Sequence, residues 1–170
     1  MFIAIVCQNS LRLPSAFYHS WRSGHLNEIW INENNITINK WFSWVMEHLE
    51  EDTNQITHRG FYDEVFTKYL ELFPTSRFYI IDNTYAFDHM QELSDMLATE
   101  LNLSMKIIQK DIHKNSGIAK KVTLTDYNLA RLKQFYRPHE RRFIDIIMRK
   151  QNVKTFPANE FLKEWNISEH

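Results

Sequence analysis

Residues 2–22 read FIAIVCQNSLRLPSAFYHSWR, and this stretch decides the fold. Its first five residues, FIAIV, are apolar and rich in β-branched side chains, as in a strand that is buried on both faces of a sheet. A polar loop follows, and SAFYHSWR (15–22) then predicts a short helix, with Pro14 in its first turn and Gly24 at its end. A strand that leads through a loop into a helix is typical of an α/β fold.

The rest of the chain continues this alternation. RFYIID (77–82) predicts a second strand, and KIIQKDI (106–112) is a candidate edge strand. Helices are predicted at 40–50, 61–73 before Pro74, 88–101, from Thr123 or Thr125 to Pro138, and again beyond Pro138, whereas 25–39 and 113–122 are expected to be loops. We therefore expect one α/β domain over residues 1–170, with a parallel sheet and flanking helices. Two clear strands are few for such a sheet, so we expect it to be incomplete at its N-terminal side.

Composition narrows the classes of function. The 170 residues are 44% hydrophobic and 14% aromatic, which indicates a globular protein. With a formal net charge of −1, the chain as a whole has no electrostatic attraction to nucleic acid or to an anionic membrane. No stretch of the sequence approaches the roughly 18 apolar residues that a membrane span needs. The single cysteine excludes an internal disulfide. Eight histidines occur without the helical spacing of metal ligands, so we expect no metal site.

Arg12 and Ser15 follow the first strand at the point where the helix is expected to begin. In open α/β sheets ligands bind beyond the carboxyl ends of strands, where the N–H groups of a helix N-terminus favour an anion. An arginine fork and a hydroxyl three residues apart would suit a phosphate. Two simpler interpretations remain open: Ser15 is a helix-start residue, and Arg12 is a solvated loop cation.

Four segments resemble, in order, the sulfotransferases that use PAPS (3′-phosphoadenosine 5′-phosphosulfate), and most closely the heparan sulfate N-sulfotransferase group. The first, residues 2–24, resembles their 3′-phosphate-binding strand, turn and helix. The others are GFYDEVFTKYLELFPTSRFYIIDNTYAF (60–87), MQELSDMLATELNLS (90–104) and LARLKQFYRPHERRFIDIIMRKQNVKTFPANEFLKEW (129–165). The resemblance implies a P-loop-NTPase-like, three-layer parallel sheet.

The resemblance also implies the residues of a cofactor site. Arg12 and Ser15 match the pair that holds the 3′-phosphate of PAPS or of its product PAP. Gly117, Lys120 and Lys121 match, more loosely, a loop that closes over the cofactor, although a solvated basic loop is an equal alternative. On the same basis His19 and Arg22 are assigned to the acceptor substrate, a glycan or another hydroxyl or amine.

The chain departs from the family where catalysis takes place. The family's 5′-phosphosulfate loop, with its catalytic lysine, and the base that deprotonates the acceptor would precede residue 1, so no catalytic residue is assigned here. If the true gene product is longer and includes these groups, the resemblance implies transfer of sulfate from PAPS to a glycan. For the heparan type this reaction takes place in the Golgi lumen. Alternatively, the chain is an inactive fragment or pseudoenzyme that binds a nucleotide, a glycan or a partner protein. A helical adaptor without a sheet is the third hypothesis.

Three further features are interpreted from the residues alone. A sheet without its first strand exposes an edge, so we expect self-association through that edge. Arg137, Arg141 and Arg142 could bind an anionic glycan but are more typical of a solvated helix face. Cys7 lacks a nearby histidine and is interpreted as a buried thiol rather than a nucleophile, and His139 is expected to pack at the helix break.

Overall fold

The computed structural model describes residues 1–23, 38–48, 57–102, 123–156, 161 and 165. The three strands in this part of the chain, β1 (Phe2–Val6), β2 (Phe78–Asp82) and β3 (Val153–Phe156), form one parallel sheet in the order β1-β2-β3. The register pairs Val6 with Asp82 and Ile81 with Phe156, so the carboxyl ends of the strands lie along one edge. The expected α/β class with a parallel sheet is therefore confirmed.

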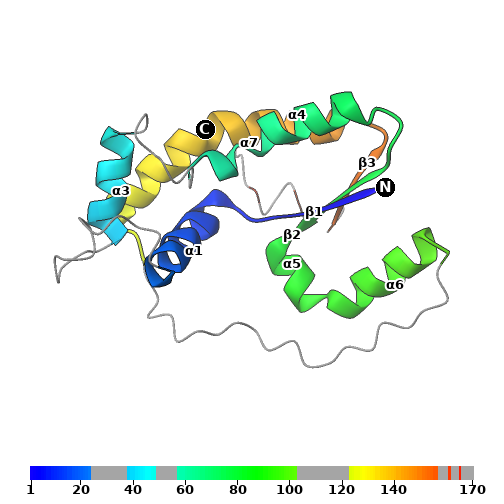
Figure 1. Ribbon diagram of the computed structural model, residues 1–170, viewed down its shortest axis with the longest axis horizontal. Helices are drawn as coiled ribbons and strands as arrows, with labels where there is room; N and C mark the ends of the chain where they lie inside the picture. The colour runs from blue at the N-terminus through cyan, green and yellow to red at the C-terminus, as the bar shows by residue number, and fades with distance from the viewer. Residues whose placement is uncertain (24–37, 49–56, 103–122, 157–160, 162–164, 166–170) are drawn as a thin grey trace.

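The described residues also contain six α-helices (Figure 1). They are α1 (Asn9–Arg22), α3 (Ile38–Glu47), α4 (Tyr62–Leu72), α5 (Asn83–Asp88), α6 (Met90–Glu100) and α7 (Asp126–Arg149), and a short 3-10 helix, η2 (His58–Gly60), precedes α4. Helices α4 and α7 lie side by side along one side of the sheet, and α5 and α6 lie on the other side (Figure 1).

Apolar side chains from these layers form three clusters. The first joins the face of the sheet under α4 and α7, and includes Val6, Phe66, Ile80 and Phe143. The second joins α1, α3 and the first half of α7, and the third is a small cluster of Ile81, Ala86 and Leu93 beneath α5 and α6. Burial of such side chains supplies most of the driving force for folding.

The opening strand is less buried than its composition suggests. Ile3 is 44% exposed and Ile5 is 60% exposed, whereas Val6 is buried. The prediction of burial on both faces is therefore wrong for β1. The physical reason is its position at one edge of the sheet, where α4 and α7 cover the face that carries Phe2, Ala4 and Val6 while the opposite face is largely open.

Two prolines do not have the effect expected of them. Helix α1 begins at Asn9, so Pro14 lies in its interior rather than in its first turn. Helix α7 runs unbroken through Pro138, and the predicted break there is wrong. Proline in a helix removes one backbone hydrogen bond, but Tyr136 and Phe143 on either side of Pro138 are fully buried, and this packing holds the helix together.

The remaining differences concern short elements. Helix α5 and strand β3 were not expected, and the helix predicted over 88–101 is α6 preceded by α5. Thr125, rather than Thr123, caps α7 by accepting a hydrogen bond from the N–H of Asn128 at 3.3 Å. The candidate edge strand at 106–112, the loop at 113–122 and Gly24 lie outside the described residues. The loop predicted over 25–39 lies outside them up to residue 37, and its last two residues belong instead to α3.

Candidate functional site

Two helices begin where the first two strands end. Asp82, the last residue of β2, accepts hydrogen bonds from the N–H groups of Thr84 (2.8 Å) and Tyr85 (3.3 Å) and so caps α5. Its second oxygen accepts from the indole Nε1 of Trp165 at 3.1 Å. The start of α5 is thus already occupied by a carboxylate. The other helix that begins at this edge of the sheet is α1, which follows β1.

Arg12 lies in the second turn of α1 and is held by two side chains. Its Nε donates to Asn9 Oδ1 at 3.0 Å, and its Nη2 donates to the hydroxyl of Tyr136 on α7 at 3.1 Å. The hydroxyl of Tyr136 in turn donates to the carbonyl of Thr57 at 2.7 Å. Arg12 is therefore not a solvated loop cation. Its Nη1 donates no hydrogen bond within the described residues.

Asn9 connects this arginine to two other elements. Its Nδ2 donates to the carbonyl of Gly60 at 3.3 Å and to Glu140 Oε1 at 3.0 Å, and its side chain is buried. Burial raises the pKa of Glu140, and the hydrogen bonds from Asn9 oppose this shift. The five residues Asn9, Arg12, Gly60, Tyr136 and Glu140 are hereafter called the Arg12 network.

Arg12, Ser15 and His19 lie on one face of α1, because spacings of three and four residues bring side chains to the same side of a helix. Ser15 and His19 are exposed. Ser15 is the seventh residue of the helix, so it is not a helix-start residue. Arg22 is the last residue of α1, while Gly117, Lys120 and Lys121 lie outside the described residues.

Cys7 follows β1 at the same edge. The hydroxyl of Tyr62 donates to its carbonyl at 3.1 Å and accepts from its N–H at 3.3 Å. Burial and the charge of Asp82 raise the pKa of the Cys7 thiol, and Arg12 opposes them. Burial also raises the pKa of Tyr62. Both groups therefore stay protonated at neutral pH, which disfavours a role for Cys7 as a nucleophile.

A charged cluster on α4 and α7 was not predicted. The carboxylate of Asp63 is buried, accepts from Arg142 Nε at 2.7 Å and lies 2.9 Å from His139 Nδ1. The ring of His139 stacks on Phe61 with centroids 3.7 Å apart. Arg142 is thus paired with a buried carboxylate rather than only solvated, although its side chain is 55% exposed. The sequence signal was the spacing of Asp63 with Phe66 and Leu70, which places it on the buried face of α4.

Two further features are absent from the described part of the chain, a metal site and a membrane-spanning helix. No group of three or more His, Cys, Asp or Glu side chains there could hold a metal ion. Every helix there is too short or too polar to cross a membrane.

Comparison of the chain with protein-family models, with curated proteins and with solved structures gave no match.

Proposed function

We propose that this chain is a sulfotransferase-like α/β domain that binds a 3′-phosphorylated adenine nucleotide, PAPS or PAP, beside the carboxyl end of β1. One observation carries the proposal: Arg12 is fixed by Asn9 and Tyr136, and its Nη1 donates no hydrogen bond to a described residue. A guanidinium that is already ordered loses little conformational entropy when it binds a phosphate.

The neighbouring groups favour an anion at this position. Ser15 lies one helical turn beyond Arg12 on the same face, and its exposed hydroxyl can donate to a phosphate oxygen. Both residues lie in the first two turns of a helix whose N-terminal end carries partial positive charge. His19 continues this face, and the proposal assigns it, with Arg22, to the acceptor. Gly117, Lys120 and Lys121 are proposed to close over the nucleotide.

The reaction itself is a further step of the proposal. Sulfuryl transfer requires a cation at the bridging oxygen and a base for the acceptor hydroxyl or amine. The resemblance assigns neither role to a residue of this chain. We therefore propose nucleotide binding as the function of this chain. Transfer of sulfate to a glycan is proposed only for a protein that also supplies the cation and the base. A P-loop-like sheet is part of the same proposal, and the parallel order β1-β2-β3 is compatible with it.

Titration of the purified chain with PAP by isothermal calorimetry tests the site. Ser15→Ala is expected to weaken binding by about tenfold, because one hydrogen bond to a charged phosphate is lost. The substituted side chain is exposed in the wild type and alanine favours a helix, so the fold is expected to be unchanged. Arg12→Lys keeps the charge but loses the planar fork, and it is expected to weaken binding at least as much.

Arg149→Ala provides the matched control, because this exposed arginine lies at the far end of α7. Its affinity for PAP is expected to equal that of the wild type. Absence of PAP binding by the wild-type chain would contradict the proposal. A loss of affinity in Arg149→Ala with no loss in Ser15→Ala would contradict the assigned position, since it would indicate attraction by overall charge alone.

We also propose that a second copy of the chain pairs along β1. The exposed Ile3 and Ile5 lie on an edge strand, and such edges are prone to pair with other strands. Ile5→Lys is expected to weaken self-association at least tenfold, because it would bury a charge in the contact. Sedimentation-velocity ultracentrifugation over a concentration series measures this change.

Val65→Lys is the control for the β1 edge. Val65 is an apolar residue with a similar exposure, 48%, but it belongs to helix α4 rather than to the edge strand. This variant is expected to associate as the wild type does. A wild-type chain that remains monomeric over the whole concentration range would exclude pairing through β1.

A further inference from the structure

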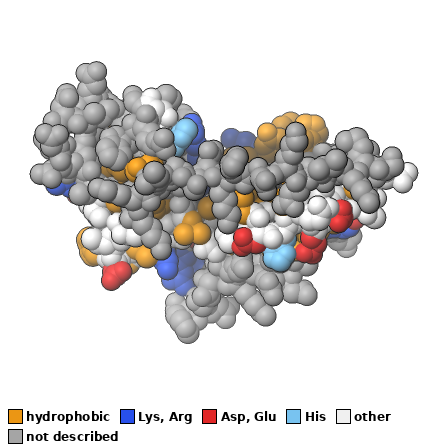
Figure 2. Space-filling model, turned by 90° about the horizontal axis from the view of Figure 1, so that it is seen from below, with side chains coloured by type: hydrophobic (Ala, Val, Ile, Leu, Met, Phe, Trp, Pro, Cys, Tyr) orange, Lys and Arg blue, Asp and Glu red, His pale blue; other side chains and the backbone are white. Residues whose placement is uncertain are grey.

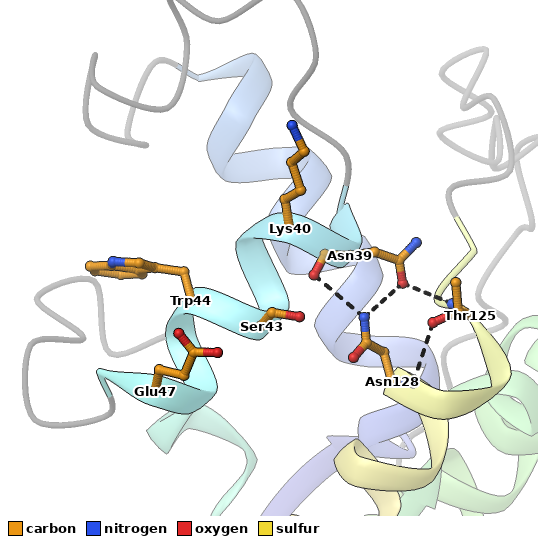
Figure 3. Close-up of a pocket in the computed structure, with 7 residues that line it drawn as sticks. All are labelled: Asn39, Lys40, Ser43, Trp44, Glu47, Thr125 and Asn128. Carbon is orange, nitrogen blue, oxygen red and sulfur yellow. Dashed lines mark hydrogen bonds between the residues drawn. The ribbon is translucent and has the colours of Figure 1, made fainter.

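A pocket lies between α3 and the first turn of α7, with a volume of about 400 Å³ (Figure 3). Residues from both helices line it: Asn39, Lys40, Ser43, Trp44, Glu47, Thr125 and Asn128. Asn128 lies eight residues before Tyr136, which corresponds to roughly 12 Å along α7. The pocket is therefore separate from the Arg12 network.

The amide of Asn128 is oriented by its neighbours. Its Nδ2 donates to the side-chain oxygen of Asn39 at 3.0 Å and lies 3.4 Å from the backbone carbonyl of Asn39 (Figure 3). The backbone N–H of Thr125 donates to that same Asn39 oxygen at 2.8 Å, which identifies it as an acceptor. A flipped Asn128 amide would face two oxygens, so its Oδ1 must point away from Asn39.

This oxygen has no partner in the described part of the chain. Asn128 is only 5% exposed, and its Oδ1 is the buried side-chain atom there that lacks a hydrogen bond. Buried acceptors are nearly always satisfied, because an unpaired one loses its hydration without compensation. Since Asn128 lines the pocket, a ligand in the pocket can supply the missing donor.

The surroundings narrow the chemistry of that ligand. A carboxylate, phosphate or sulfate brings only acceptors and cannot satisfy Asn128 Oδ1. A cation is disfavoured beside the first turn of α7, where the helix end is partially positive. Ser43 and Glu47 add a hydroxyl and a second acceptor along α3, and Lys40 also lines the pocket. A ligand hydroxyl suits this set, because it can donate to Asn128 while accepting from Ser43.

We propose that the pocket between α3 and α7 binds a neutral sugar ring. One sugar hydroxyl donates to Asn128 Oδ1, a second donates to the carboxylate of Glu47, and Trp44 supplies an apolar wall. The site is independent of nucleotide binding, because it shares no residue with Arg12 and its network. It gives the protein a contact for an uncharged saccharide unit.

Saturation-transfer difference NMR with lactose and with N-acetylglucosamine tests the site in the full chain. Both sugars are expected to receive magnetisation from the protein, and Asn128→Ala is expected to abolish the effect. Ser43→Ala and Glu47→Gln are each expected to weaken binding about three- to tenfold through loss of one hydrogen bond. Neither Ser43 nor Glu47 is buried, so both variants are expected to fold, and they still test the site if Asn128→Ala does not fold.

Glu71→Gln, an exposed position on α4, is the matched control for Glu47→Gln and is expected to bind as the wild type does. Agmatine and inorganic sulfate serve as cationic and anionic probes. Preferential binding of either would overturn the assignment of a neutral sugar, and so would the absence of transfer to both sugars. Binding that is unchanged in the Ser43 and Glu47 variants would overturn the location.

Discussion

Gly60→Ala is expected to destabilise the protein by about 3 kcal/mol, which corresponds to a fall in Tm of roughly 6 to 12 °C for a chain of this length. A Cβ at position 60 would lie 2.6 Å from Tyr136 Cε1, 2.8 Å from Arg12 Nη2 and closer still to Asn9 Oδ1. Asn9 and Tyr136 are fully buried and hydrogen-bonded, so neither can move aside without losing partners. The methyl group must therefore disrupt the Arg12 network.

Thermal unfolding followed by circular dichroism measures this effect, and a double-mutant cycle tests its cause. Asn9→Ala removes the nearest obstacle, so the double variant with Gly60→Ala is expected to be more stable than the sum of the two single changes predicts. Gly60→Ala is also expected to weaken PAP binding, because Arg12 loses its supports. Additive changes in the cycle, or wild-type stability of Gly60→Ala, would contradict the steric explanation.

The sequence was sufficient for the elements with strong periodic or apolar signals. β1, β2 and α4 begin and end within one residue or so of their predicted bounds, because an apolar run or an amphipathic stripe marks each. Strand β3 has no such mark, since Lys154 and Thr155 interrupt its short apolar pattern. Helix α5 was missed because Asp82 is both the last strand residue and the helix cap, which leaves no loop to recognise.

The candidate site was predictable only in its local part. Arg12 and Ser15 could be placed beyond β1 because both follow it closely in the chain. The partner that fixes Arg12, Tyr136, lies 124 residues away, and no local pattern links the two.

Propensity rules also misjudged Pro138, since they include only the cost of a proline and not the packing of the helix that contains it.

Asp82→Ala is expected to have the second large effect, a decrease of roughly 3 kcal/mol in the free energy of unfolding. The change removes the cap of α5, worth about 1 kcal/mol, and leaves the buried Nε1 of Trp165 without its acceptor, which costs about 1 to 3 kcal/mol. Asp88→Ala, at the exposed last residue of α5, is the control and is expected to change stability by less than about 0.5 kcal/mol. Urea unfolding of both variants measures the difference.

Asp82→Asn separates the charge of this residue from its shape. Asparagine caps a helix about as well as aspartate, so the cap of α5 is expected to remain. Its single oxygen cannot also accept from Trp165 Nε1, so a loss of about 1 to 3 kcal/mol in stability is still expected. The negative charge is lost, however, and it is one cause of the raised pKa of the Cys7 thiol. The pH profile of Cys7 alkylation is therefore expected to move to lower pH in Asp82→Asn and to stay unchanged in Asp88→Ala. An unshifted profile in Asp82→Asn would mean that burial alone holds the thiol protonated, and that the carboxyl ends of β1 and β2 are electrostatically independent.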